Sequence, residues 1–283
     1  MRPIEWGCLL ALAAVYLPAL RALSEIWFSV DYYSHGVLVP LVALWSALHN
    51  PILRRAPREP RDGRGLALVL AALALYAAGL GLGSPSLQGG ALVLTVAGGV
   101  LQRWGPAGLR ALAFPVGFLA FMLPVPDAWL TPLIVQLQLW VSSAATALLH
   151  ATGFEVAREG NVLRLPDGAS LFVAEACSGI TSIVTLTPLA VVLAALTERH
   201  LVRRLLIVAS VVPLAMLGNL VRVIGTVLAS SAFGVERATE GPIHDLAGVA
   251  SFALSCLMLI GVGMALGRFG PPLPGRQPSP RPG

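Results

Sequence analysis

The sequence predicts an all-α polytopic membrane protein, and three observations support that prediction. Hydrophobic residues make up 56% of the 283 residues, whereas charged residues make up only 12%, about half of their share in soluble domains. Apolar segments follow one another along the chain, and several are long enough for a helix that crosses a bilayer. The basic residues, 19 arginines and no lysine, gather in the loops, as they do where loops stay in the cytoplasm.

The apolar segments define the elements in order: residues 4–23, 36–49, 65–83, 87–102, 108–123, 130–151, 177–197, 205–228 and 244–267. We interpret 4–23 as a retained first helix, because it lacks a convincing small-residue cleavage site and more spans follow. Residues 1–269 are expected to form a single integral membrane domain. The tail at 270–283 is rich in proline and glycine, which predicts a disordered cytoplasmic segment.

Loop arginines orient the chain. Basic loops that should be cytoplasmic lie at 50–64, 103–110, 198–204 and from 268 onward, whereas the loops at 24–35 and 83–88 carry no arginine and should face outward.

Segment 130–151 does not fit this alternation, because a crossing there would move the basic loop 198–204 outside. The segment also holds several polar residues, among them Gln136 and Gln138. We therefore predict that it lies along the outer interface or dips in and returns. About eight transmembrane helices remain, with both termini cytoplasmic.

The stretch that follows should be external and partly β. Residues 155–173 alternate in polarity on either side of Pro166-Asp167-Gly168, which predicts a small outer β-hairpin. This hairpin leads directly to Cys177.

Three chemically distinct side chains fall at segment ends on this outer side. Cys177 begins one span, and His244 begins the last. Arg222 lies roughly 26 Å along the span from residue 205, near its outer end. An intramembrane charge is usually functional, and a thiol, a permanent cation and an imidazole at one depth indicate a cysteine-nucleophile enzyme.

The chemistry predicts a role for each. Cys177 attacks as its thiolate, and a helix N-terminus with a nearby Arg222 favours that anion. Arg222 can instead donate to the oxyanion that forms on attack. His244 can take the thiol proton and return it to the leaving amine. Supporting or substrate-binding candidates are His35, Ser178, Gly179 and Asn219.

Other chemistries are disfavoured. The absence of lysine excludes a Schiff base and a Ser-Lys dyad, and we find no zinc motif, so no metal or cofactor is expected. No Gly-x-Ser-x-Gly element indicates a serine protease, and a lipid-phosphate phosphatase would want more external basic residues. The alternative function is a transporter or an exopolysaccharide-export component, in which Arg222 binds an anionic substrate.

At these residues the sequence resembles the exosortase/archaeosortase family. The resemblance covers most of the chain and is carried by six motifs in order: Tyr33-Ser34-His35-Gly36, Leu123-Pro124-Val125-Pro126-Asp127, Glu159-Gly160-Asn161, Ala176-Cys177-Ser178-Gly179-Ile180, Asn219-Leu220-Val221-Arg222-Val223 and His244-Asp245-Leu246-Ala247-Gly248.

The resemblance implies a thiol protease or transpeptidase of the bacterial inner membrane, with its active site facing the periplasm. The family's cysteine, arginine and histidine correspond to Cys177, Arg222 and His244. The implied substrates are secreted proteins with a C-terminal tail made of a Pro-Glu-Pro-like motif, one membrane helix and an arginine cluster. Hydrolysis and transfer to an amine or a glycan both remain open. Nucleic acid is not an expected partner, because the net charge of +5 comes mostly from loop arginines.

Overall fold

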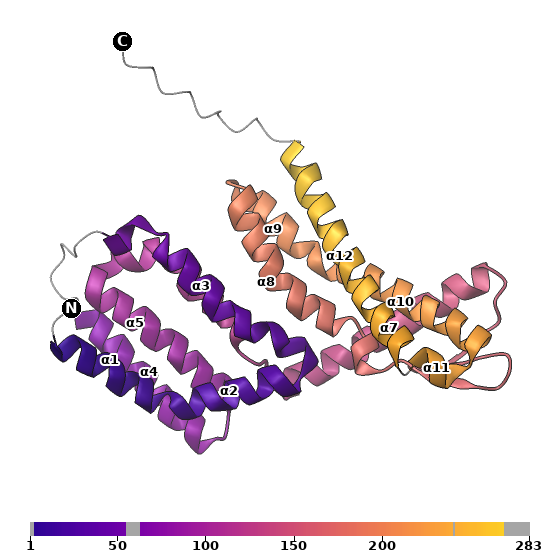
Figure 1. The fold of residues 1–283 in the computed structure, drawn as a ribbon, viewed down its shortest axis with the longest axis horizontal. Coiled ribbons are helices and arrows are strands. Elements are labelled where there is room, and N and C mark those ends of the chain that lie inside the picture. The colour runs from indigo at the N-terminus through magenta and orange to yellow at the C-terminus, as the bar shows by residue number, and fades with distance from the viewer. Residues whose placement is uncertain (1–2, 55–62, 240, 269–283) are drawn as a thin grey trace, which may run out of the picture. The chain divides into compact units, whose positions relative to one another are not determined.

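The computed structural model describes residues 3–54, 63–239 and 241–268. In this part of the chain the fold is mostly helical with one small antiparallel sheet (Figure 1). The chain divides into two compact units, Met1–Leu130 and Thr131–Gly283. The tail predicted to be disordered lies outside the described residues, as does most of the predicted basic loop at 50–64.

The first unit is helical throughout its described residues. Its elements are α1 (Pro3–Val15), α2 (Leu17–Ser29), the 3₁₀ helix η1 (Asp31–Val37), α3 (Leu38–Leu48), η2 (Pro51–Arg54), α4 (Gly63–Gly81), α5 (Pro85–Ala111), α6 (Ala113–Phe118) and η3 (Leu119–Met122). The predicted spans 4–23 and 36–49 differ from these elements. The first is interrupted at Tyr16, and the second corresponds to the 11 residues of α3.

Helices α4 and α5 pack side by side through glycines (Figure 1). A Cβ atom at Gly65 would lie 2.3 Å from the backbone nitrogen of Gln102, and one at Gly98 would lie 2.8 Å from Val69. Small residues at such contacts let two helix backbones approach closely, which is a common way for membrane helices to associate.

Helix α5 merges two helical stretches across a kink. Gly105 has φ 68° and ψ −170°, and Pro106 follows it. A second break separates α5 from α6 and η3, which bend by 92° relative to it. The sequence predicted two spans here, at 87–102 and 108–123. The structure instead has a long kinked helix followed by a short bent segment.

The second unit contains α7 (Asp127–Ala151), which begins just before the division, and then β1 (Ala157–Glu159), β2 (Val162–Arg164), β3 (Ser170–Phe172), η4 (Glu175–Cys177), α8 (Ile180–Thr197), α9 (Leu201–Ala209), α10 (Val211–Phe233), α11 (Val235–Thr239) and α12 (Pro242–Arg268). The predicted hairpin about residues 166–168 is present as β2 and β3, and β1 adds a third strand. In the register, Leu163 faces Leu171 on β3 and Arg158 on β1.

The sheet and α7 share a core that reaches the start of α8. It holds Val141, Ala145 and Leu149 of α7, which recur at helical spacing, together with Leu163, Leu171 and Val173 of the sheet region, Cys177, and Val223 and Val227 of α10. The apolar face of α7 is therefore covered by the sheet, and the polar strand residues such as Arg158 stay exposed.

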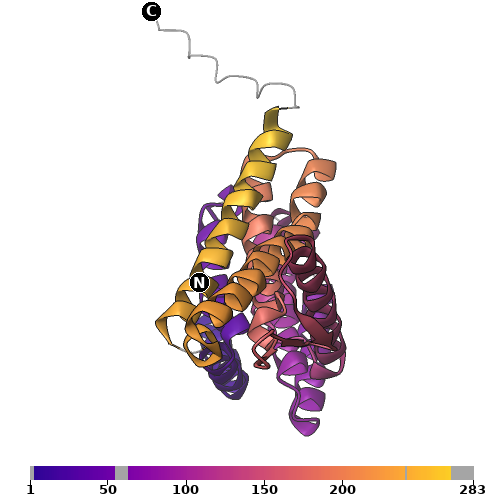
Figure 2. The same ribbon diagram turned by 90° about the vertical axis from the view of Figure 1, so that its right-hand side faces the viewer.

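Helices α8, α10 and α12, with the shorter α9 and α11, form the rest of the second unit. Helix α12 lies along α10 in both views (Figures 1 and 2). At their contact a Cβ atom on Gly218 would lie 2.1 Å from Oγ of Ser255 and 2.8 Å from the carbonyl oxygen of Ser251. The close approach of α10 to α12 thus depends on glycine at position 218.

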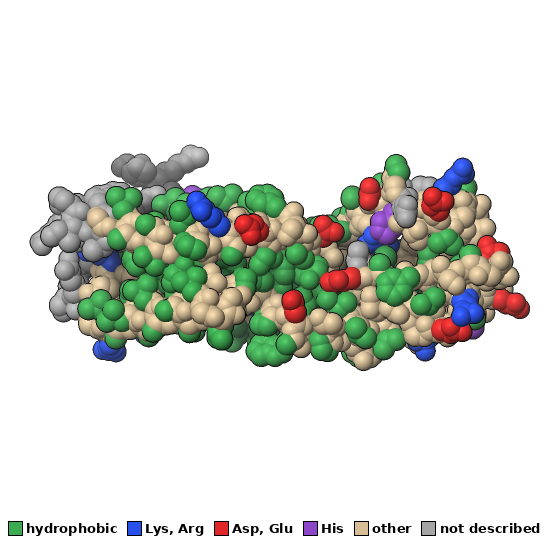
Figure 3. Space-filling model, turned by 90° about the horizontal axis from the view of Figure 1, so that it is seen from below, with side chains coloured by type: hydrophobic (Ala, Val, Ile, Leu, Met, Phe, Trp, Pro, Cys, Tyr) green, Lys and Arg blue, Asp and Glu red, His purple; other side chains and the backbone are tan. Residues whose placement is uncertain are grey.

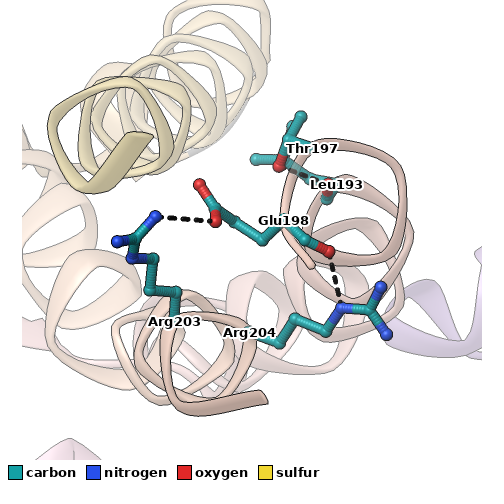
Figure 4. A network of polar contacts seen from close by, with 5 residues as sticks. All are labelled: Leu193, Thr197, Glu198, Arg203 and Arg204. Atoms are coloured by element: carbon teal, nitrogen blue, oxygen red, sulfur yellow. Dashed lines mark hydrogen bonds and ion pairs between the residues drawn. The ribbon is translucent and has the colours of Figure 1, made fainter. Parts of the chain in front are cut away.

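The turn between α8 and α9 is held by polar contacts (Figure 4). The buried carboxylate of Glu198 pairs with Arg203 at 3.5 Å, and its carbonyl oxygen accepts from Nε of Arg204 at 2.7 Å. Of the three arginines in the predicted basic loop 198–204, Arg203 and Arg204 are therefore bonded to Glu198, at the end of α8 that is far from Cys177.

Five described helices are long and apolar enough to cross a membrane: Gly63–Gly81, Asp127–Ala151, Ile180–Thr197, Leu201–Phe233 and His244–Gly267. The bent pair from Pro85 to Met122 makes a sixth if it is counted as one span. By length and composition the described chain thus has five or six candidate spans, against about eight predicted, with α9 and α10 counted as one span. The candidates include α7, for which the sequence predicted no crossing. Figure 3 shows hydrophobic side chains over much of the visible surface, as expected for a multi-pass membrane protein.

Candidate functional site

Cys177 lies in a tight turn that precedes α8. It ends the 3₁₀ helix η4, and Ser178 and Gly179 separate it from the first residue of α8, Ile180. Gly179 has φ +91°, a left-handed conformation that favours glycine. Oγ of the fully buried Ser178 accepts from the backbone N–H of Ile180 at 3.2 Å. The small residues after Cys177 therefore form the turn and cap the helix.

Asn219 of α10 contacts this turn directly. Its side-chain Nδ2 donates to the carbonyl oxygen of Cys177. A Cβ atom at Gly179 would lie 3.5 Å from Cβ of Asn219, so the turn and α10 are in van der Waals contact. Asn219 is thereby placed as a support of the backbone at Cys177.

Arg222 and His244 are in contact across α10 and α12. Nη2 of Arg222 lies 2.9 Å from Nε2 of His244. A guanidinium group only donates, so Nε2 of His244 is the acceptor and the proton of the neutral ring is on Nδ1. A Cβ atom at Gly248, one turn along α12, would lie 3.3 Å from Nη2 of Arg222, so glycine leaves the space that the guanidinium occupies.

The electrostatics of Cys177 combine two opposing effects. Burial raises the pKa of the thiol, and the charge of Arg222 lowers it. The burial effect is the larger, since Cys177 is only 7% exposed. At neutral pH the resting side chain is therefore a thiol, and ionisation has to be promoted by a base or by substrate.

The structure thus brings four predicted residues into one region of the second unit. Arg222 contacts His244, the charge of Arg222 acts on Cys177, and Asn219 bonds to the Cys177 backbone. Their catalytic roles remain predictions.

His35 belongs to the first unit, where its side chain is hydrogen-bonded to the backbone of Phe121. Its Nε2 donates to the carbonyl oxygen of Phe121 at 3.2 Å, and burial lowers the pKa of the ring. Beside it the hydroxyl of Tyr33 accepts from the N–H of Val125, and the indole of Trp27 donates to the carbonyl oxygen of Met122. Two of the motifs, 33–36 and 123–127, are therefore bonded to one another, a relationship that sequence order does not reveal.

Sequence reasoning also missed the part played by Gln138. We noted this residue as a sign of an interfacial segment, but its side chain is buried against the sheet. The available signal was its place on the same helical face as Val141, Ser142 and Ala145.

Among the residues that the structure describes, no three His, Cys, Asp or Glu side chains gather to hold a metal ion.

Comparison with protein families gives a match over most of the chain. The family described as transmembrane exosortase (EpsH) matches residues 27–261, a range that includes Cys177, Arg222, His244 and His35. Comparison with curated proteins and with solved structures gives no match.

Proposed function

The chain belongs to the transmembrane exosortase family, whose members are transpeptidases, and from this premise we propose that it is a membrane cysteine enzyme that cleaves the C-terminal sorting tail of secreted proteins. The observation that carries the proposal is the contact of Arg222 with His244, together with the effect of the Arg222 charge on the pKa of the buried Cys177 thiol. A nucleophile, a cation and a proton carrier within one region are the parts that an acyl-transfer enzyme needs.

In the proposed reaction, Sγ of Cys177 attacks the scissile carbonyl carbon after its proton passes to His244. Arg222 donates to the oxyanion that forms. Because Nε2 of His244 accepts from Arg222 in the resting arrangement, the guanidinium has to turn toward the scissile carbonyl oxygen of the bound substrate, which frees that nitrogen for the thiol proton. His244 then protonates the leaving amine as the carbon–nitrogen bond breaks, leaving a thioester on Cys177. Water, an amine or a glycan hydroxyl releases the acyl group and restores the thiol.

We propose the topology from the sequence, with eight spans, both termini cytoplasmic and the active site on the periplasmic side of a bacterial inner membrane. The packing of the sheet on α7 supports a non-crossing α7. The sheet carries the exposed ion pair of Arg164 with Glu159, and an exposed charge pair is costly in the hydrocarbon region. The part of α7 that the sheet covers therefore lies at the outer interface or re-enters under protein.

The implied substrate is a protein with a motif, one membrane helix and an arginine cluster at its C-terminus. We propose that residues 1–269 act on it as a single exosortase-like domain, because the family match extends from 27 to 261 and so through both units.

The test is co-expression with a secreted protein that carries a Pro-Glu-Pro motif, a helix and an arginine cluster. Tail removal is followed by immunoblot for the wild type, for Cys177→Ala and for the matched control Cys256→Ala, which removes a half-buried thiol of α12. We expect cleavage with the wild type and the control and none with Cys177→Ala.

Cleavage that persists in Cys177→Ala removes this thiol as the nucleophile. If no form cleaves any of a panel of such tails, while all are present in the membrane in equal amounts, the alternative of a transporter or export component gains support.

A further inference from the structure

A closed set of hydrogen bonds joins α7, the sheet and the segment that leads to Cys177. Nε2 of Gln138 donates to the carbonyl oxygen of Val173 at 3.0 Å, and Oε1 of Gln138 accepts from Nδ2 of Asn161 at 3.2 Å. The backbone N–H of Val173 donates to the carbonyl oxygen of Asn161 at 2.9 Å and closes the set. We call the side chains of Gln138 and Asn161, together with the backbone of Val173, the Gln138 frame.

We propose that Gln138 and Asn161 are positioning residues that fix the place of the Cys177 thiol through the backbone of Val173. The proposal deepens the proposed function and rests on it, since positioning serves catalysis only if Cys177 is the nucleophile.

The connection from the frame to the thiol is short. Val173 is followed by Ala174, whose carbonyl oxygen accepts from the backbone N–H of Cys177 at 2.9 Å. Val173 and Cys177 also lie in the same buried core. A shift of Val173 therefore moves the η4 turn, whose other end Asn219 holds from α10.

Burial alone does not require a glutamine at this position. The neighbouring buried residues on α7 are the apolar Leu137, Val141 and Ala145 and the small polar Ser142, whose hydroxyl donates to the backbone carbonyl oxygen of Gln138 and leaves the Gln138 side chain free for other partners. The amide of Gln138 instead uses its donor and its acceptor on two different segments, and buried polar networks that are fully satisfied specify one arrangement. That property suits a backbone that has to present a nucleophile.

The test measures how fast the Cys177 thiol is alkylated in the full-length protein. The variants are made in a background of Cys8→Ser and Cys256→Ser, which leaves Cys177 as the one thiol. Gln138→Met keeps the length of the side chain and removes the amide. The matched control is Gln136→Met, an exposed position on the same helix. N-ethylmaleimide is the probe, and both the rate and the final extent of alkylation are measured.

We expect Asn161→Ala, which removes one hydrogen bond of the frame, to raise the alkylation rate by up to about tenfold. Gln138→Met removes two of these bonds and should raise the rate at least as much, and the final extent should be unchanged in both variants. The double variant should react no faster than Gln138→Met alone, because that substitution already removes both side-chain hydrogen bonds of the frame. Gln136→Met should react like the background. A misfolded fraction would instead appear as a separate fast phase in the time course of alkylation.

Gln138→Glu provides the conservative variant. A neutral carboxyl can donate to Val173 and accept from Asn161, whereas a carboxylate can only accept. The ratio of its alkylation rate to that of the background should therefore fall toward one as the pH is lowered. Equal rates in Gln138→Met and Gln136→Met, or a ratio that does not depend on pH, overturn the proposal.

The same variants separate this proposal from the proposed function. In the tail-removal assay, Gln138→Met should lower kcat with little change in KM, because the buried Gln138 does not reach substrate. If tail removal persists in Cys177→Ala, the nucleophile assignment fails even where the alkylation rates support the frame. If Cys177→Ala abolishes tail removal, but Gln138→Met is alkylated and cleaves the tail at the same rates as Gln136→Met, only the positioning role of Gln138 is wrong.

Discussion

The side-chain amide of Asn219 donates to the carbonyl oxygen of Cys177, and so α10 holds the backbone of the turn that carries the thiol. Arg222 lies three residues farther along α10 and acts on the same thiol through its charge. One helix therefore supports the backbone of the proposed nucleophile and carries the cation whose charge acts on its thiol. Such support from regular secondary structure keeps reacting groups in a fixed mutual geometry.

The first prediction concerns Asn219→Ala. The substitution leaves the buried carbonyl oxygen of Cys177 without its side-chain donor, which costs about 1–3 kcal/mol. We expect tail removal to slow by roughly tenfold or more, measured as the initial rate per amount of protein in the membrane. Asn219→Asp should be as slow, because a carboxylate cannot donate.

The matched control for that prediction is Leu217→Ala, which changes an exposed side chain of the same helix. A wild-type rate in Asn219→Ala, or an equal loss in Leu217→Ala, would contradict the role given to the amide.

The second prediction concerns the contact of α10 with α12. Gly218→Ala places a Cβ atom where Oγ of Ser255 and the carbonyl oxygen of Ser251 now lie. The two helices must separate, and overpacking of this kind costs about 1–3 kcal/mol. Because His244 lies on the same helix about two turns before Ser251, the separation should also lengthen its contact with Arg222 and lower activity.

Gly225→Ala is the control on the same helix, since nothing lies within 4 Å of a Cβ atom built there. Replacing this helical glycine should leave stability unchanged or raise it by up to about 1 kcal/mol. Thermal unfolding of the purified proteins in detergent compares the two variants, and equal midpoints for both would refute the packing argument.

Sequence patterns predicted most of the second unit. Loop charges and helix rise predicted Cys177, Arg222 and His244 at segment ends of one depth, and the structure puts Arg222 against His244. Arg222 lies near the middle of α10 (Val211–Phe233), however, because that helix extends beyond the predicted end at 228. The hairpin about residues 166–168 was predicted because alternation and a Pro-Asp-Gly turn are local signals. Position along a helix is likewise a local property, which explains why both predictions could be made without tertiary information.

Several of the features that were missed depend on tertiary contacts. The interruption at Tyr16 has a local signal that sequence reasoning passed over, since Pro18 stands in the first turn of α2. The hydrogen bond of Tyr16 to Thr95, 79 residues away, is a partner that no local pattern encodes. The kink in α5 depends on the positive φ of Gly105. A glycine before a proline can adopt such a φ but often does not, so the sequence alone did not predict the kink. The partners of Gln138, on strands that follow α7, were also not evident, because polarity alone predicts an interfacial residue as readily as a buried one.

The third prediction concerns pH and uses the single-thiol background. Since burial raises the pKa of Cys177, its alkylation rate should rise with pH over a range above that of a free thiol, about 8.5. Removing the charge that lowers this pKa, in Arg222→Met, should move the profile to still higher pH. Arg222→Lys keeps a charge and should lie between the two. Rates measured by mass spectrometry across the pH range give the three profiles.

The control for the charge is Arg199→Met, which removes an exposed arginine at the other end of α8 from Cys177. Helix α8 is roughly 27 Å long. At that distance screening should make the effect of Arg199 on the thiol negligible. The same shift has a consequence for stability. The folded state keeps the thiol neutral while the unfolded thiol ionises, so the contribution of Cys177 to stability is present at low pH and is lost as the pH rises through the folded pKa. Profiles of Arg222→Met and Arg199→Met that coincide would show that Arg222 does not act on the thiol, and the assignment of the cation in the proposed reaction would then be wrong.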